Sequence, residues 1–270
     1  MVSVLLRVSG VKNRFSVVTF SINRDRSSAW WFARCTFWWV GGYAGRLDDL
    51  TAPNEIGDRR LLLVDRAVMD AVTDDVESIQ IISYPHPTLR MVAKPIVRVD
   101  AELRRVAARM LDLMYEHNGV GLAATQVNIP LRLFVMNETG NREQGEELIL
   151  INPECQRPKG NEVSQEGCLS LPEVHGDVKR PKQIQLTAYS IDGELIERTV
   201  DGFLARVIQH EYDHLEGVLF FDRMTEEGRV ELEGRLAELE SDFRHRQKSG
   251  EIAADDALVS SIRRWHERYA

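Results

Sequence analysis

Q-H-E-Y-D-H-L-E-G, residues 209–217, is the stretch of this chain around which the rest of the fold is organised. If it is helical, His210 and His214 lie one turn apart on the same face, where their imidazoles can bind one metal ion. Glu211 lies beside them and is suited to carry a proton during hydrolysis. We therefore predict a metal-binding helix over residues 202–215.

The neighbours of this motif indicate a buried helix. Val207, Ile208 and Leu215 are apolar, and ionisable side chains among such residues are costly unless they are paired or bound to a metal. The alternative is a chance H-E-x-x-H sequence on a solvated helix, because the motif alone is not specific.

A third ligand decides the class of metal site. The three-histidine extension of the metzincins is excluded because Phe220 stands where the third histidine should be. A thermolysin-like site would use a downstream glutamate such as Glu231 or Glu233, but both lie in an ordinary charged helix. Cys168 is the better candidate, because a thiolate with two imidazoles leaves one coordination position open. From this residue alone, a small buried cysteine remains the alternative.

A glycine-containing motif, G-V-G-L-A-A-T-Q, occupies residues 119–126. Its two glycines let the backbone approach a ligand closely, and the amide of Gln126 can donate a hydrogen bond to a developing oxyanion. Alternatively, the glycines only end a helix and the small residues only allow close packing.

Taken together, three motifs resemble the peptide deformylase family. The family pattern of G-x-G-L-A-A-x-Q, E-G-C-L-S and Q-H-E-x-D-H-L-x-G is matched in this order without a departure at a catalytic position. The sequence Y-P-H-P-T-L-R at residues 84–90 also looks like the start of the family, and the resemblance covers about residues 79–224. It implies hydrolytic removal of the formyl group from N-formylmethionine on nascent chains, with release of formate.

The resemblance also implies a role for each matched residue. One divalent ion, Fe²⁺ by family habit and replaceable by Zn²⁺, Ni²⁺ or Co²⁺, would be bound by Cys168, His210 and His214. Glu211 would transfer the proton of the attacking water to the leaving amine. Gln126 and the backbone N–H of Leu169 would stabilise the tetrahedral oxyanion.

The substrate pocket is assigned from fewer observations. Val120, Phe203 and Val207 are candidates for binding the methionine side chain, and plain core packing is the alternative for all three. Gly121 and Gly167 are candidates for binding the substrate backbone.

The remaining pattern predicts an α+β fold with mixed or antiparallel sheets around the central metal-binding helix and a C-terminal helix. Asp100 is the predicted N-cap of an amphipathic helix that ends near residues 118–119. Asp192 and Gly193 form a hairpin turn signal. The predicted strands are residues 79–82, 131–136, 148–151, 184–189 and 195–200, and the predicted charged C-terminal helix is residues 225–248.

Three domains are expected. Residues 1–68 form a leader of uncertain status, with four of the five tryptophans in ten residues and no sustained helix or strand period. We expect it to be disordered and either cleaved, as an organellar transit peptide is, or not translated, with the true start at Met69. Residues 69–224 form the catalytic domain, and residues 225–270 form a charged helical extension.

Composition limits the partners. No run of about 18 apolar residues is present, so we expect no membrane span, and three scattered cysteines indicate a reducing compartment. The acidic main body argues against nucleic-acid readout. The expected setting is the bacterial cytoplasm, or an organelle if residues 1–68 are a transit peptide. The expected partners are N-formylmethionyl nascent peptides. The family resemblance also implies docking of the C-terminal extension at the ribosome near the exit tunnel, whereas the mixed charges of this extension favour the alternative of a solvated helix.

Two alternative functions remain at this point. A zinc endopeptidase could use the same helix, and it would keep its ion without Cys168. A non-catalytic protein that binds the ribosome could have kept the fold, although it would not need Cys168, Glu211 and Gln126 together.

Overall fold

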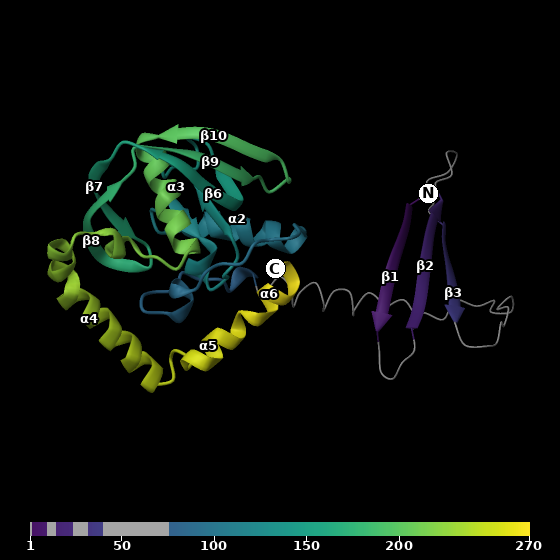
Figure 1. Cartoon of the computed structure of the whole chain (residues 1–270). Helices are drawn as coiled ribbons and strands as arrows, with labels where there is room; N and C mark the ends of the chain where they lie inside the picture. The colour runs from purple at the N-terminus through teal and green to yellow at the C-terminus, as the bar shows by residue number, and fades with distance from the viewer. Residues whose placement is uncertain (1, 10–14, 24–31, 40–75) are drawn as a thin grey trace. The chain divides into compact units, whose positions relative to one another are not determined.

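The computed structural model describes residues 2–9, 15–23, 32–39 and 76–270. The chain divides into two units, Met1–Leu62 and Leu63–Ala270. The first unit contains one antiparallel sheet of order β1-β2-β3, formed by β1 (Val2–Ser9), β2 (Phe15–Asn23) and β3 (Phe32–Trp39) (Figure 1). These strands differ from the expected segment without regular structure. They are rich in β-branched and aromatic residues, which favour strands even without alternation. The predicted domain boundary at residues 68–69 lies outside the described residues.

The second unit contains a five-stranded antiparallel sheet of order β10-β9-β6-β5-β4 and a separate two-stranded sheet. The larger sheet consists of β4 (Gly121–Ala123), β5 (Leu133–Met136), β6 (Leu148–Lys159), β9 (Gln183–Tyr189) and β10 (Leu195–Asp201). The smaller sheet pairs β7 (Glu162–Cys168) with β8 (Leu171–Arg180). Together with the helices, these sheets confirm the predicted α+β class.

Two helices cover opposite faces of the larger sheet. Alternate residues of a strand point to opposite faces, and on β5 Leu133 and Val135 join the apolar cluster of α2 (Ala101–Glu116). Phe134 and Met136 join the cluster of α3 (Gly202–Leu215) instead. The predicted metal-binding helix is thus confirmed as a helix, and it lies buried against the sheet.

The C-terminal extension leaves the body and returns to it. It begins after η3 (Phe220–Arg223) and consists of α4 (Glu226–Lys248), α5 (Asp255–Ser261) and α6 (Arg263–Tyr269). Most of α4 is exposed, as expected for a charged helix, and Figure 1 shows it along the outside of the unit. In contrast, Trp265 and Tyr269 of α6 are buried in the α2 cluster. The last turns of the chain are therefore part of the folded body.

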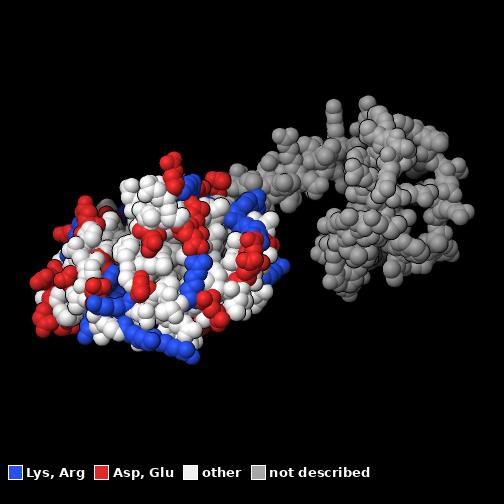
Figure 2. All heavy atoms as spheres, turned by 90° about the horizontal axis from the view of Figure 1, so that it is seen from above, with Lys and Arg blue, Asp and Glu red and all other residues white. Residues whose placement is uncertain are grey.

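Charges of both signs are mixed on the surface of this unit. Figure 2 shows acidic and basic side chains interspersed on one face, without a continuous basic stripe on that face. Such mixing is typical of a solvated surface.

In the second unit the sequence analysis predicted one strand that does not form and missed three strands. Residues 79–82 form no strand, because only isolated backbone bonds such as Ile82 N–H to the Gln126 carbonyl hold them. The strands β4, β7 and β8 were not predicted, and the first three residues of the E-G-C-L-S motif end β7. On β8 a positive φ of 62° at Glu173 interrupts the alternation of buried and exposed residues that would have indicated a strand.

Asp100 joins the beginning of α2 to the end of α6. As the predicted N-cap, it accepts hydrogen bonds from the backbone amides of Glu102 and Leu103. It also accepts one from the Tyr269 hydroxyl at 2.8 Å and pairs with Arg268 at 2.9 Å. Burial raises the pKa of Asp100, but the Leu103 amide and Arg268 outweigh burial and lower the pKa from 3.8 to about 2.

We expect Asp100→Ala to lower the free energy of unfolding by about 1 to 2 kcal/mol, because the helix loses its cap. Asp100→Asn keeps an oxygen that can cap the helix, so its free energy of unfolding should fall by less. Since the folded-state pKa is depressed, the charge of Asp100 stabilises the fold above about pH 4, and this contribution declines as the pH falls toward 2. Urea denaturation at pH 7 and pH 3 tests this. A difference between wild type and Asp100→Asn that does not shrink at pH 3 would contradict it.

Candidate active site

Three potential metal ligands converge on one point of the second unit. The ligand atoms of Cys168, His210 and His214 all lie within 4.8 Å of one another, the one such group among the described residues. Cys168 is the last residue of β7, and the histidines are one turn apart on α3. The Sγ of Cys168 is 3.2 Å from Nε2 of His214. One thiol and two imidazoles at this spacing fit a borderline-soft divalent ion with an open coordination position.

Glu166 orients His210 toward this point. Its Oε2 lies 3.0 Å from Nδ1 of His210, which leaves Nε2 of the ring for an ion. Burial lowers the pKa of His210, but hydrogen bonds with Cys168 and Glu166 raise it to about 10 in the metal-free protein. Burial and the neighbouring His210 lower the pKa of His214 well below its usual value. An ion bound at Nε2 of His210 would therefore displace a proton from this ring.

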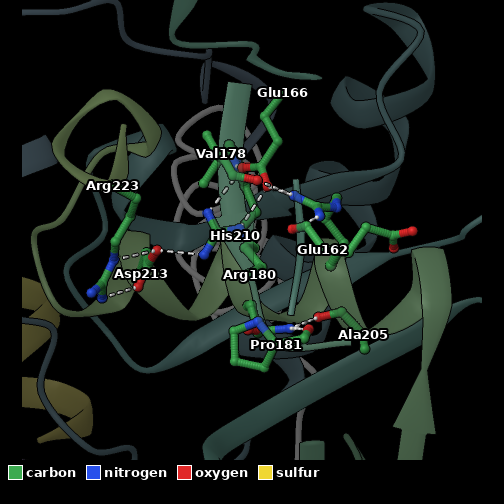
Figure 3. Close-up of polar contacts among 11 residues, drawn as sticks. Glu162, Glu166, Val178, Arg180, Pro181, Ala205, His210, Asp213 and Arg223 are labelled. Carbon is green, nitrogen blue, oxygen red and sulfur yellow. Dashed lines mark hydrogen bonds and ion pairs between the residues drawn. The ribbon is translucent and has the colours of Figure 1, made fainter. Parts of the chain in front are cut away.

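The carboxylate of Glu166 belongs to a buried ion-pair cluster, part of which Figure 3 shows. Nε and Nη2 of Arg180 donate to its two oxygens at 2.6 and 2.9 Å, and Nη1 of Arg206 donates to Oε1 at 2.7 Å. Arg180 also donates to Asp213 of α3 at 2.7 Å, and Asp213 pairs with Arg223. Sequence reasoning missed this cluster. The available signal was Arg206, placed one helical turn before His210 on the same face.

Glu211 is buried beside the ligands, and its Oε2 has no hydrogen-bond partner among the described residues. Burial raises the pKa of this carboxyl to about 7. A carboxyl that titrates near neutral pH can both accept and return a proton. Gly121 of β4 provides the space for it, since a Cβ at position 121 would lie only 2.9 Å from Cδ of Glu211.

Gln126 and Leu169 are both neighbours of Cys168, the first by contact and the second in the sequence. Gln126 belongs to η2 (Ala124–Val127), and its Oε1 accepts a hydrogen bond from the Ala123 amide at 2.8 Å. This contact fixes the side-chain amide, so that Nε2 points to Sγ of Cys168 at 3.4 Å and to Oγ of Ser170 at 3.3 Å. Leu169 follows Cys168 directly and is half-buried.

A cleft of about 490 Å³ opens over these groups. The predicted site residues in its wall are Val120, Gly121, Gln126, Gly167, Cys168, Leu169, Phe203, Val207, His210 and Glu211. His214 is 1% exposed and lies beneath the wall. The cleft also has lining residues that sequence reasoning did not assign, among them His117, Pro172, His175 and Arg206. The structure thus brings every predicted site residue to one place, while their roles remain to be tested.

We expect Gly121→Ala to lower kcat about 100-fold while the bound ion is kept, because the new methyl group displaces the Glu211 carboxyl and misplacement by about 1 Å can cost this much. Steady-state kinetics measures kcat, and metal analysis of the same preparation measures the bound ion. Gly234→Ala on α4 is the control, since a Cβ there meets no atom within 4 Å. Unchanged kcat in Gly121→Ala would show that Glu211 does not depend on this gap.

Comparison with known proteins agrees with this geometry. The family model described as polypeptide deformylase matches residues 78–230. Peptide deformylase of Rhodopirellula baltica is 52% identical over 191 residues, covering 71% of this chain and 95% of that protein. Peptide deformylase 1B, chloroplastic/mitochondrial, of Arabidopsis thaliana is 36% identical over 207 residues, covering 76% of this chain and 75% of that protein.

Solved structures show the same likeness. A crystal structure of a plant peptide deformylase is 38% identical, with a TM-score of 0.61, and the match covers 64% of this chain and 94% of that one. The Thermotoga maritima peptide deformylase is 42% identical, with a TM-score of 0.52 and coverage of 54% and 97%. Sequence, fold and site lead to one conclusion, and the zinc endopeptidase alternative is not favoured. The chain belongs to the polypeptide deformylase family.

Proposed function

We propose that this metal-dependent hydrolase removes the formyl group from N-formylmethionyl nascent peptides in the cleft above Cys168, His210 and His214. The observation that carries the proposal is the convergence of one thiol and two imidazoles beside the buried carboxyl of Glu211. The products are formate and a peptide with a free terminal amine. We propose Fe²⁺ as the native ion, with Zn²⁺, Ni²⁺ and Co²⁺ as replacements that the same donors can bind.

When bound, the ion would lower the pKa of its water toward about 7 and would polarise the formyl oxygen. Glu211 accepts the proton of the attacking water and returns it to the nitrogen of the leaving amine. Burial prepares it for both steps, because its pKa in the metal-free protein is about 7. Nε2 of Gln126 and the backbone N–H of Leu169 donate to the oxyanion, each stabilising it by about 2.7 to 4 kcal/mol.

The apolar part of the cleft suits the methionine side chain. Val207 is buried in the cleft wall, and Val120 lines the same cleft. Phe203 is 55% exposed on the first turn of α3, and an aromatic side chain left open at a cleft gains stability when a ligand covers it. Gly121 and Gly167 line the same cleft, and we propose that their backbone, which has no side chain of its own, binds the substrate backbone.

Cys168→Ala tests the ligand set against the endopeptidase alternative. We expect the variant to retain little of the bound ion and to lose formate release from formyl-Met peptides, because two imidazoles alone bind a divalent ion weakly. Metal analysis of protein purified without oxygen, together with a formate assay, measures both. A variant that keeps its ion and cleaves internal peptide bonds of unformylated peptides would instead support an endopeptidase.

We further propose that α4 contacts the ribosome near the exit tunnel. Arg229 and Arg244 of α4 are exposed, whereas α6 is occupied by packing against α2. Removal of the whole extension would also remove buried Phe243 and Tyr269, so the sharper test is charge reversal. Arg229→Glu with Arg244→Glu should reduce pelleting with ribosomes while formate release from peptides is kept. Equal pelleting of wild type and variant would exclude this surface.

The bacterial cytoplasm is the proposed location, or an organelle if residues 1–68 are removed as a transit peptide. No helix among the described residues is long and apolar enough to cross a membrane. A mass measurement of protein from the source cell settles where the mature chain starts.

A further inference from the structure

The ligands of the proposed ion belong to two different substructures. His210 and His214 are on α3, which packs against the five-stranded sheet. Cys168 ends β7, which pairs only with β8 in a sheet that shares no strand with the larger one. The Cys-His-His geometry therefore depends on whatever holds the β7–β8 hairpin, residues 162–180, against α3.

Arg206 makes three hydrogen bonds from α3 to this hairpin. Nη1 donates to Oε1 of Glu166 at 2.7 Å and to the Val178 carbonyl at 3.0 Å, and Nη2 donates to the Glu162 carbonyl at 2.9 Å. The acceptors lie on both strands, since Glu162 is at the start of β7 and Val178 is on β8. One side chain thus holds both strands of the hairpin and the carboxylate that orients His210.

The geometry points to Arg206 as a positioning residue of the metal site. Its side chain is 9% exposed. Its planar guanidinium reaches acceptors on both strands, which the ammonium group of a lysine could not reach together. By holding the hairpin at a fixed distance from α3, it places Cys168 before an ion arrives, so that less ordering is needed on binding. This inference rests on the proposed ligation of the ion by Cys168, His210 and His214.

The other polar contacts between hairpin and helix do not hold the backbone of β7. Arg180 of β8 reaches Asp213 on α3, and Gln209 of α3 donates to the carbonyl of Pro181, just beyond the hairpin. From β7, Glu166 and Cys168 reach the two histidines through their side chains alone. Among the described side-chain hydrogen bonds between α3 and the hairpin, the one that reaches the backbone of β7 comes from Arg206. Loss of Arg206 should therefore loosen the strand that carries Cys168.

Titration of metal-free protein with Co²⁺ tests the inference, because thiolate ligation of Co²⁺ gives a charge-transfer absorption in the near ultraviolet. We expect Arg206→Met to weaken Co²⁺ binding about 10- to 100-fold, the usual cost of losing a group that supports a metal ligand. Arg206→Lys should also lower the affinity for Co²⁺ about tenfold or more, since a lysine keeps the charge but cannot contact both strands. In the metal-free variants, amides of residues 162–168 should exchange hydrogen faster than in wild type.

Arg132→Met is the matched control. Taken as whole residues, Arg132 is 9% exposed and Arg206 is 7% exposed. It also anchors α3, by pairing with Glu216 just beyond its end, but its other polar partner is Pro153 of β6. We expect this variant to bind Co²⁺ within about threefold of wild type.

Three outcomes would overturn the inference. Wild-type Co²⁺ affinity in both Arg206 variants would show that the hairpin is placed without this side chain, and the lysine variant alone decides this if the methionine variant does not fold. An equal loss in Arg132→Met would indicate general destabilisation. Absence of the thiolate absorption in wild type would instead remove the proposed ligand set itself, which distinguishes the two failures.

Discussion

Glu211→Gln is expected to keep the bound ion and to lose about a thousandfold in turnover on formyl-Met peptides. Glutamine has the same shape as glutamate but cannot accept the proton of water, and a positioned acid–base group contributes 10²- to 10⁴-fold. The carboxyl is 3% exposed, so no other base from solvent can take its place easily. Steady-state formate release and metal analysis of the same preparation measure the two expectations.

Glu197→Gln is the matched control, because it makes the same change on the exposed side of β10. It should leave both turnover and metal content unchanged. Turnover of Glu211→Gln within tenfold of wild type would remove the proton-transfer role from this residue. Loss of the ion along with activity would mean that Glu211 supports the site rather than the chemistry.

Glu166→Ala is expected to lower the free energy of unfolding by about 3 to 5 kcal/mol, the usual cost of removing one partner from a buried ion pair. The substitution leaves Nε and Nη2 of Arg180 and Nη1 of Arg206 without their acceptor. The side chains of these arginines are 4% and 9% exposed, so water cannot readily replace the carboxylate. His210 loses its orienting partner as well.

Urea denaturation of metal-free protein is the appropriate measurement, because a difference in bound ion cannot then contribute to the midpoint. Glu146→Ala is the control. It removes an ion pair with Arg198 in which both side chains are 45% exposed or more, and such pairs contribute about 0 to 1 kcal/mol. Similar midpoints for the two variants would mean that the cluster does not stabilise the fold.

The helices could be predicted from the sequence because their signals are local. Residues 202–215 were predicted to be helical, and α3 spans Gly202–Leu215. The apolar residues around H-E-x-x-H repeat with the helical period, as do those of α2 after its cap at Asp100. The metal ligands could be proposed because each lies in a compact motif whose residue types suit one chemistry.

The hairpin that carries Cys168 could not be predicted in the same way. Its strand β7 turns Glu166 inward, so that its buried side is ionic and shows no apolar alternation. The partners of Glu166 are 14 to 44 residues away in sequence, and no local pattern reports on them. The same holds for Tyr269, whose hydroxyl contacts Asp100 across 169 residues. Gly121 was predicted to bind the substrate backbone; the room that it also leaves for Glu211 has no local signal, because the two residues are far apart in sequence.

The division of the site between hairpin and helix also bears on how long an ion stays bound. Local openings of a protein cost less free energy than its global unfolding, and an opening between two substructures can separate ligands that lie on each of them. Here a swing of residues 162–180 away from α3 would detach the thiol while both histidines stay in place. The dissociation rate of the ion should therefore follow the opening of the hairpin rather than the global stability of the protein.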